Sequence, residues 1–144
     1  MKNYINTKVD WAKSQSSITK LLNSKGIYET RFTNLEDRFA LEFRFVENGI
    51  SKPLTVRIVV PLEKIDNEEK HKKYINQLYR VLFYHLKAKF IAIESGLTEF
   101  IQEFMPHLVI MDKLGNSTTM SQALLPQYKK NLETGEQGEF KLLN

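Results

Sequence analysis

The chain has 144 residues, of which 42% are hydrophobic and 26% are charged, and this length and composition are typical of one soluble globular domain. It contains no cysteine, which excludes disulfides, thiolate nucleophiles and cysteine-ligated metal centres. The formal net charge of +4 permits a polyanionic partner without requiring one.

The N-terminal segment carries no long apolar run, and no window reaches the roughly 18 apolar residues of a membrane span. We therefore expect no secretory signal and no membrane partner, and a cytoplasmic location in a host cell. Residues 1–9 are expected to form a flexible arm. Asp10 is a good N-cap residue, and Gly26 favours the turn after a last helical residue, so a helix is predicted over residues 11–25.

Three strands are predicted next, over residues 27–33, 39–46 and 54–60. The second and third strands alternate apolar and polar residues, so one face of each is apolar. Between them lies Asn48-Gly49, the strongest two-residue hairpin signal. A two-residue turn there places Phe43 opposite Leu54 and Phe39 opposite Ile58, with every apolar pair on one face.

A long helix is predicted over residues 67–95, with Asp66 or Asn67 as its cap and Gly96 after its end. Thr98 is predicted to cap a short helix that Pro106 closes, and a fourth strand follows over residues 107–111. A last short helix is expected to begin at Ser117 or Thr118 and to end at Leu125, before Pro126.

This order, α-β-β-β-α-α-β-α, predicts the α+β class, with helices packed on one face of an antiparallel sheet of three to four strands. Residues 10–126 are expected to form the single domain. Residues 127–144 are polar and are expected to form an extended tail, with Phe140, Leu142 and Leu143 as its docking residues.

The long helix divides into two faces. An apolar stripe around Leu82 predicts the core side. The opposite side carries basic residues with one aromatic between them, a combination that suits phosphate contact and base stacking, although a solvated helix face also carries charge. The candidate nucleic-acid-binding residues, with one arginine added from the third strand, are Lys70, Lys73, Arg80, Tyr84, Lys87 and Arg57.

Three arginines, Arg31, Arg44 and Arg57, are expected on the polar face of the sheet together with Glu29 and Glu42. They form either an uncovered platform for nucleic acid or cross-strand ion pairs of Glu29 with Arg44 and of Arg31 with Glu42.

Lys89 projects near the middle of the apolar stripe, with His85 near its edge. Lys89 either extends its charge to solvent along apolar neighbours or pairs with Glu94, Glu99 or Glu103. The three histidines have no ligand spacing, and the sequence contains no phosphate-binding glycine loop, nucleophile elbow or HExxH motif. We expect no catalytic residues, no metal, no cofactor and no enzymatic activity.

Two resemblances add context. Residues 10–93 resemble the double-stranded-RNA-binding domain in the order of their elements, and "KHKKYINQLYR" supplies the lysines that family uses, but Tyr74 and Ile75 stand where the family has small residues. The segments "SITKLLNSKGI", "RFTNLEDRFALEF", "YRVLFYHLKAKFIAIESGL", "FIQEFMPHLVI" and "ALLPQYKK" resemble small uncharacterised proteins of phages and mobile elements. That resemblance implies a phage gene product with an accessory or inhibitory binding role.

The sequence therefore predicts a non-enzymatic accessory binding protein that contacts nucleic acid, or a host or phage nucleoprotein complex, through the basic helix face. The alternative is a protein–protein interaction module, either a homo-oligomeric structural protein or an inhibitor of a host protein.

Overall fold

The computed structural model describes residues 9–135. The elements follow the order α1 (Trp11–Ser24), β1 (Thr30–Asn34), β2 (Arg38–Phe45), β3 (Leu54–Pro61), α2 (Glu68–Glu94), α3 (Phe100–Phe104), η2 (Met105–His107), β4 (Val109–Met111), β5 (Ser117–Thr119) and α4 (Met120–Thr134). The first three strands form one antiparallel sheet, and β4 pairs with β5 in a separate hairpin. The predicted α+β class and order are confirmed, with β5 as an addition.

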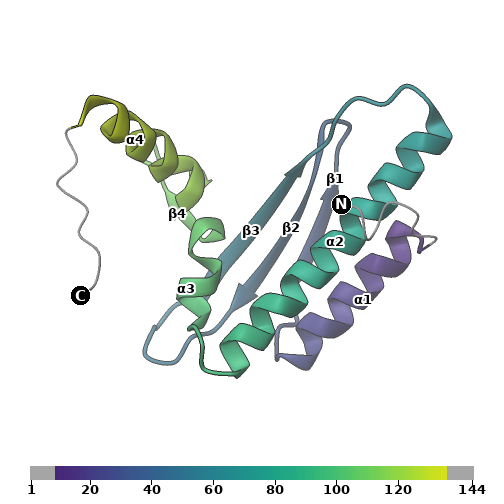
Figure 1. The fold of residues 1–144 in the computed structure, drawn as a ribbon. Coiled ribbons are helices and arrows are strands. Elements are labelled where there is room, and N and C mark those ends of the chain that lie inside the picture. Colours follow the sequence, from purple (N-terminus) through teal and green to yellow (C-terminus); the bar gives the residue numbers. More distant parts are fainter. Residues whose placement is uncertain (1–8, 136–144) are drawn as a thin grey trace.

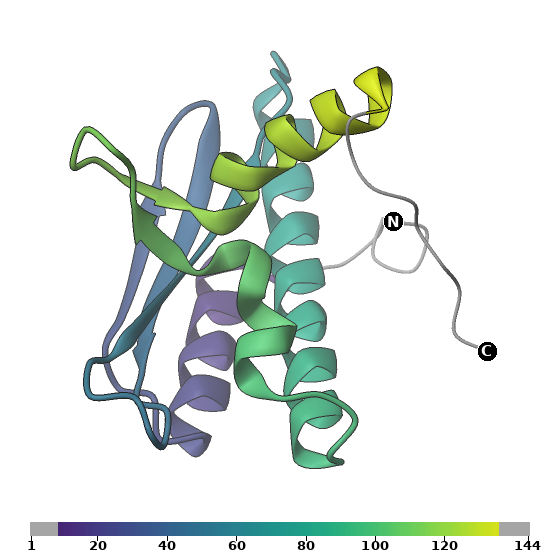
Figure 2. The ribbon, with the colours of Figure 1, turned by 90° about the vertical axis from the view of Figure 1, so that its left-hand side faces the viewer.

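The helices α1 and α2 lie side by side over one face of the three-stranded sheet (Figure 1). The view turned by 90° shows α3 on the same side as these two helices (Figure 2). The predicted fourth strand, β4, joins the edge of the sheet only through an isolated bridge between Val56 and Leu108. The β4–β5 hairpin and α4 therefore extend from the β3 edge.

The core fills the layer between the helices and the sheet. Tyr79 is fully buried and its ring stacks on Phe39, with 4.0 Å between the ring centroids. Its hydroxyl accepts a hydrogen bond from Gln15 Nε2 (3.0 Å) and donates one to Asn34, so this buried polar atom is satisfied. The other buried apolar residues are Ile18, Leu22, Ile27, Leu41, Phe43, Val56, Ile58, Leu82, Leu86, Phe90, Phe100, Phe104 and Leu108.

The pairing of β2 with β3 corrects the predicted register by two residues. Phe43 lies opposite Val56 rather than Leu54. The predicted two-residue hairpin loop is also wrong, because residues 46–53 connect the strands; a local turn at Asn48-Gly49 forms within this connection, where the Ile50 N–H donates to the Glu47 carbonyl oxygen at 3.2 Å. A shift of two residues leaves every side chain on the face predicted for it.

Pro53 explains why the ladder resumes late. The predicted register would place Pro53 opposite Arg44, within the paired strands. Proline has no N–H to donate to a ladder, so residues 51–53 stay outside it and pairing begins with Phe45 and Leu54. The pairing of β1 with β2 places Arg31 opposite Glu42, as predicted.

The helix caps follow the sequence signals at α1 and α2 but not at α3 and α4, since the last helix begins after Thr119 and not at the predicted Ser117 or Thr118. Asp10 accepts from the Ala12 N–H, and Asn67 accepts from the Lys70 N–H, both at 3.0 Å. The cap of α3 is Glu99 and not the predicted Thr98. Glu99 and Gln102 bond each other's backbone N–H groups, which satisfies two donors of the first turn together.

The end predicted for the last helix at Leu125 is wrong. Thr119 caps α4 through a reciprocal pair with Gln122, and the helix continues through Pro126 to Thr134. A proline inside a helix removes one hydrogen bond and strains the preceding turn, but the helix here ends only at Gly135, whose φ of +68° suits glycine. The predicted tail is thus helical up to Thr134. Residues 136–144, with Phe140, Leu142 and Leu143, and residues 1–8 of the predicted arm lie outside the described residues.

Candidate interaction surfaces

The basic face predicted on α2 is divided in two. Lys70, Lys73 and Lys87 are exposed. Gln77, which helical spacing places between Lys73 and Arg80 on this face, is only 7% exposed and interrupts the row. The ammonium of Lys73 lies 3.9 Å from the Glu69 carboxylate, so one acidic side chain accompanies the lysines. The first two lysines are therefore separated from the group that begins at Arg80.

The second part of this face is ordered by stacking. The half-buried guanidinium of Arg80 lies 4.8 Å from the ring centroid of Tyr84 and 5.0 Å from that of Phe83. Its Nη2 also donates to the Tyr84 hydroxyl at 3.0 Å. Contacts of this kind are favourable at partly exposed sites. They hold a planar cation and an aromatic ring at the surface, with exposed Lys87 beside them on the same helix.

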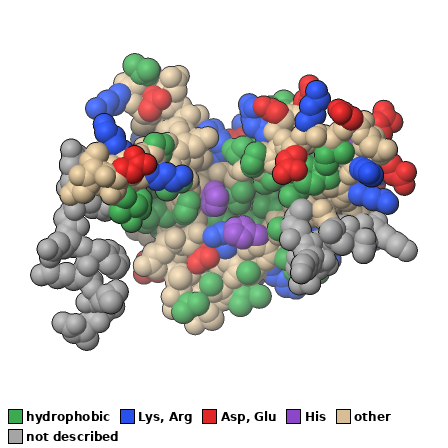
Figure 3. All heavy atoms as spheres, turned by 45° about the horizontal axis from the view of Figure 1, so that its top comes forward, with side chains coloured by type: hydrophobic (Ala, Val, Ile, Leu, Met, Phe, Trp, Pro, Cys, Tyr) green, Lys and Arg blue, Asp and Glu red, His purple; other side chains and the backbone are tan. Residues whose placement is uncertain are grey.

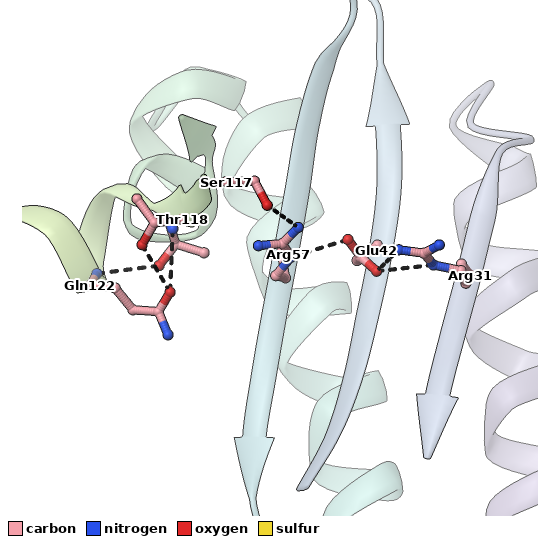
Figure 4. A network of polar contacts seen from close by, with 7 residues as sticks. Arg31, Glu42, Arg57, Ser117, Thr118 and Gln122 are labelled. Atoms are coloured by element: carbon pink, nitrogen blue, oxygen red, sulfur yellow. Dashed lines mark hydrogen bonds and ion pairs between the residues drawn. The ribbon is translucent and has the colours of Figure 1, made fainter. Parts of the chain in front are cut away.

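The sixth candidate, Arg57, lies apart from the α2 residues. It stands in β3 between the buried residues Val56 and Ile58, so its side chain points to the face of the sheet opposite the helices. Its Nε lies 3.1 Å from Glu42, and its Nη2 donates to Ser117 Oγ at 3.2 Å (Figure 4). The structure does not bring Arg57 together with the α2 residues.

The predicted cross-strand ion pairs are present on this open face. Arg31 donates twice to one carboxylate oxygen of Glu42, while Arg57 binds the other (Figure 4). Burial raises the pKa of Glu42, but the hydrogen bonds and charges of the two arginines outweigh it and hold that pKa below its usual value. Arg44 lies 3.5 Å from Glu29. Each of the three arginines therefore has a carboxylate partner, as the ion-pair alternative predicts, although two glutamates serve three arginines and Arg31 and Arg44 stay exposed.

Lys89 forms one of the predicted ion pairs. Its ammonium donates to the Glu103 carbonyl oxygen at 2.9 Å and lies 3.4 Å from the Glu103 carboxylate. Thr98 donates to the same carboxylate at 2.8 Å, and this bond, followed by the Lys89 charge, holds the pKa of Glu103 below its usual value against the opposing effect of burial. Partial burial and the Lys89 charge also lower the pKa values of His85 and His107.

Sequence reasoning missed the apolar surface of α4, because it ended that helix at Leu125. At 100° per residue, Leu124, Leu125, Tyr128 and Leu132 fall within an arc of about 100°. We call this set the α4 stripe. Each of its side chains is 45–58% exposed, and none of the residues of α4 is buried. The spacing itself was a signal for an amphipathic helix that continues past Pro126.

The described residues contain neither a candidate metal site nor a membrane-spanning helix. Within residues 9–135, no group of three or more histidine, aspartate or glutamate side chains is arranged to hold a metal ion. No helix of those residues combines the length and apolar character needed to cross a bilayer. No protein-family model, no curated protein and no solved structure matches the chain.

Proposed function

We propose that the protein is a non-enzymatic interaction module that binds a protein partner through the α4 stripe. The observation that supports this proposal is an amphipathic helix whose large apolar side chains stay about half exposed. Exposed apolar side chains that are contiguous on one surface are typical of protein interaction sites. Covering the remaining surface of each of these side chains would contribute on the order of 1 kcal/mol.

The attachment of α4 to the rest of the chain supports the same proposal. The Met120 N–H donates to the Leu108 carbonyl oxygen at 2.9 Å, and the buried Thr119 provides the cap. Beyond this first turn the helix has no buried residue, and it contains Pro126. Helices of about this length are marginal without packing, so a partner that covers the α4 stripe would stabilise the helix that it binds.

The test of this proposal is capture of proteins from a nuclease-treated cell lysate. A variant with Leu124→Ser, Tyr128→Ser and Leu132→Ser should lose the captured protein. A control with Lys130→Ser and Glu133→Ser, which changes the other side of α4, should retain it. Equal capture by both variants would contradict a protein contact through the α4 stripe. Capture by the wild-type protein from an untreated lysate that is lost from the nuclease-treated lysate would contradict it as well.

Nucleic-acid contact through α2 is the second candidate function. The observation that favours it is the surface stacking of Arg80 on Tyr84 beside the exposed Lys87, since stacked planes and cations are what single strands and phosphates bind. Binding of a labelled duplex and single strand should weaken steeply as salt increases, and Lys73→Glu with Lys87→Glu should remove it. Absence of binding at low salt would end this candidate.

The setting in which the protein acts belongs to the same proposal. The resemblance of several segments to small phage and mobile-element proteins supports a partner in the cytoplasm of a host cell, either a host protein or a nucleoprotein complex. The capture experiment identifies that partner directly.

A further inference from the structure

A groove with an apolar floor lies where α2 begins. It consists of two adjoining hollows of about 290 and 630 Å³, whose walls share Leu62, Glu68 and His71. The smaller hollow is lined by Trp11, Leu35, Phe39 and Ile75, and among these Leu35 is 48% exposed. Apolar side chains therefore line a concave surface that is open to solvent.

The rim of this groove is acidic. Two lysines, Lys64 and Lys72, line the groove. The carboxylates outnumber them, and these are Glu36, Asp37, Glu63, Asp66 and Glu68. Figure 3 shows acidic side chains gathered at the end of the molecule where α2 begins. The groove thus suits an apolar segment that carries positive charge.

The α4 stripe has these features. It presents three leucines and the ring of Tyr128 as exposed apolar surface. By helical geometry Lys129 lies about 40° from the edge of the stripe, on the side of Leu125, where it would meet an acidic rim. We propose, on the basis of the proposed function of the α4 stripe, that its partner is a second copy of this chain, which receives α4 in the acidic groove.

Such a contact joins two different surfaces. Figure 1 shows α4 beyond the β3 side of the sheet and the start of α2 on the opposite side. Such a contact closes a two-fold dimer if each copy receives the other's α4, and it otherwise builds larger rings or open chains. A single helix face buries less than the roughly 1,200 Å² of a standard interface, so assembly should depend on concentration in the micromolar to millimolar range.

Two variants with complementary defects test this geometry. The α4 variant carries Tyr128→Asp and Leu132→Asp, and the groove variant carries Leu35→Lys and Glu63→Lys. All four positions are exposed, and circular dichroism with thermal unfolding checks that both variants fold. Sedimentation velocity and light scattering then measure mass from about 10 μM to 1 mM. The wild-type protein should form a dimer or a larger assembly, and each variant alone should remain a monomer.

The equimolar mixture of the two variants is the decisive sample. It retains one intact contact, between α4 of the groove variant and the groove of the α4 variant, so it should form a dimer and nothing larger. A monomeric mixture, or a wild-type protein that is monomeric throughout, would overturn the proposal. Assembly of the groove variant alone would also overturn it, by indicating a symmetric contact between two α4 helices.

These outcomes are separable from failure of the proposed function. If the wild-type protein stays monomeric but captures a foreign protein through the α4 stripe, the second copy is the wrong partner and the interaction module stands. If neither assembly nor capture depends on the α4 stripe, both proposals fail.

Discussion

The ammonium of Lys89 donates to the backbone carbonyl oxygen of Glu103 at 2.9 Å and lies 3.4 Å from the carboxylate of the same residue. Both side chains are mostly covered, with 13% and 21% of their surfaces exposed. The contact joins the C-terminal part of α2 to α3, and the ammonium also lies 5.5 Å from the ring centroid of Phe104. A lysine that stands in an apolar stripe therefore fastens the short helix to the long one.

Removing this lysine should destabilise the fold. Lys89→Ala leaves the Glu103 carbonyl oxygen and carboxylate without their cationic partner, and loss of a partly buried, charge-assisted hydrogen bond typically costs about 1–3 kcal/mol. Urea unfolding followed by circular dichroism should show a lower midpoint. Lys87→Ala, at an exposed position of the same helix, should change the free energy of unfolding by less than about 0.5 kcal/mol. Equal midpoints for the two variants would contradict the role assigned to Lys89.

The two histidines near Lys89 predict a pH dependence. Partial burial and the Lys89 charge lower the pKa values of His85 and His107 from 6.5. Below pH 6.5 the unfolded chain therefore binds more protons than the folded chain, so the free energy of unfolding should fall as the pH falls to the lowered pKa values. Each histidine contributes a slope of at most about 1.4 kcal/mol per pH unit, reduced by solvent screening.

Unfolding in urea at several pH values between 7 and 5 measures this slope. The variant with His85→Gln and His107→Gln should show a flatter profile in that window, whereas Lys87→Gln should keep the wild-type slope. Glu42 and Glu103, with pKa values held below 4.5, add a further loss of stability only at lower pH. An unchanged slope between pH 7 and 5 in the double variant would show that these histidines do not cause the dependence.

Glu42 should contribute more to stability than Glu29, although each forms an ion pair with an arginine of a neighbouring strand. Glu42 is 14% exposed and binds two arginines, whereas Glu29 is 71% exposed and lies 3.5 Å from Arg44. Glu42→Ala should cost about 1 kcal/mol, because it leaves Arg57 partly buried without its carboxylate. Glu29→Ala should fall within about 0.5 kcal/mol of the wild type. Chemical denaturation compares the two, and a larger loss for Glu29→Ala would contradict this ranking.

Pro126 should limit the stability of α4 locally. Pro126→Ala restores an N–H that can donate to the Gln122 carbonyl oxygen, and a proline inside a helix costs about 3 kcal/mol relative to alanine. Hydrogen exchange should therefore show greater protection of residues 127–134. The global free energy of unfolding should change little, since none of the residues of α4 is buried. Gln127→Ala is the matched control, and equal protection in both variants would contradict a local effect of the proline.

Elements whose signals are local could be predicted from the amino-acid sequence. Alternation of apolar residues identified β2 and β3, and the caps at Asp10 and Asn67 marked the starts of α1 and α2. These signals depend on neighbouring residues along the chain, so no tertiary contact is needed to read them. The ion pair of Arg31 with Glu42 was also predictable, because the expected register of β1 and β2 places these two residues opposite each other.

Features that depend on distant segments became visible only in the folded chain. Burial of Gln77 divided the basic row, and Ser117 and Glu42 together held Arg57 on the open face. Neither feature follows from the period of a helix or strand, because the period indicates the side on which a side chain lies but not the residues that it contacts. The acidic groove combines residues of α1, β1, β2, α2 and two connecting loops. Its charge and apolar floor exist only because folding brings those segments to one end of the molecule.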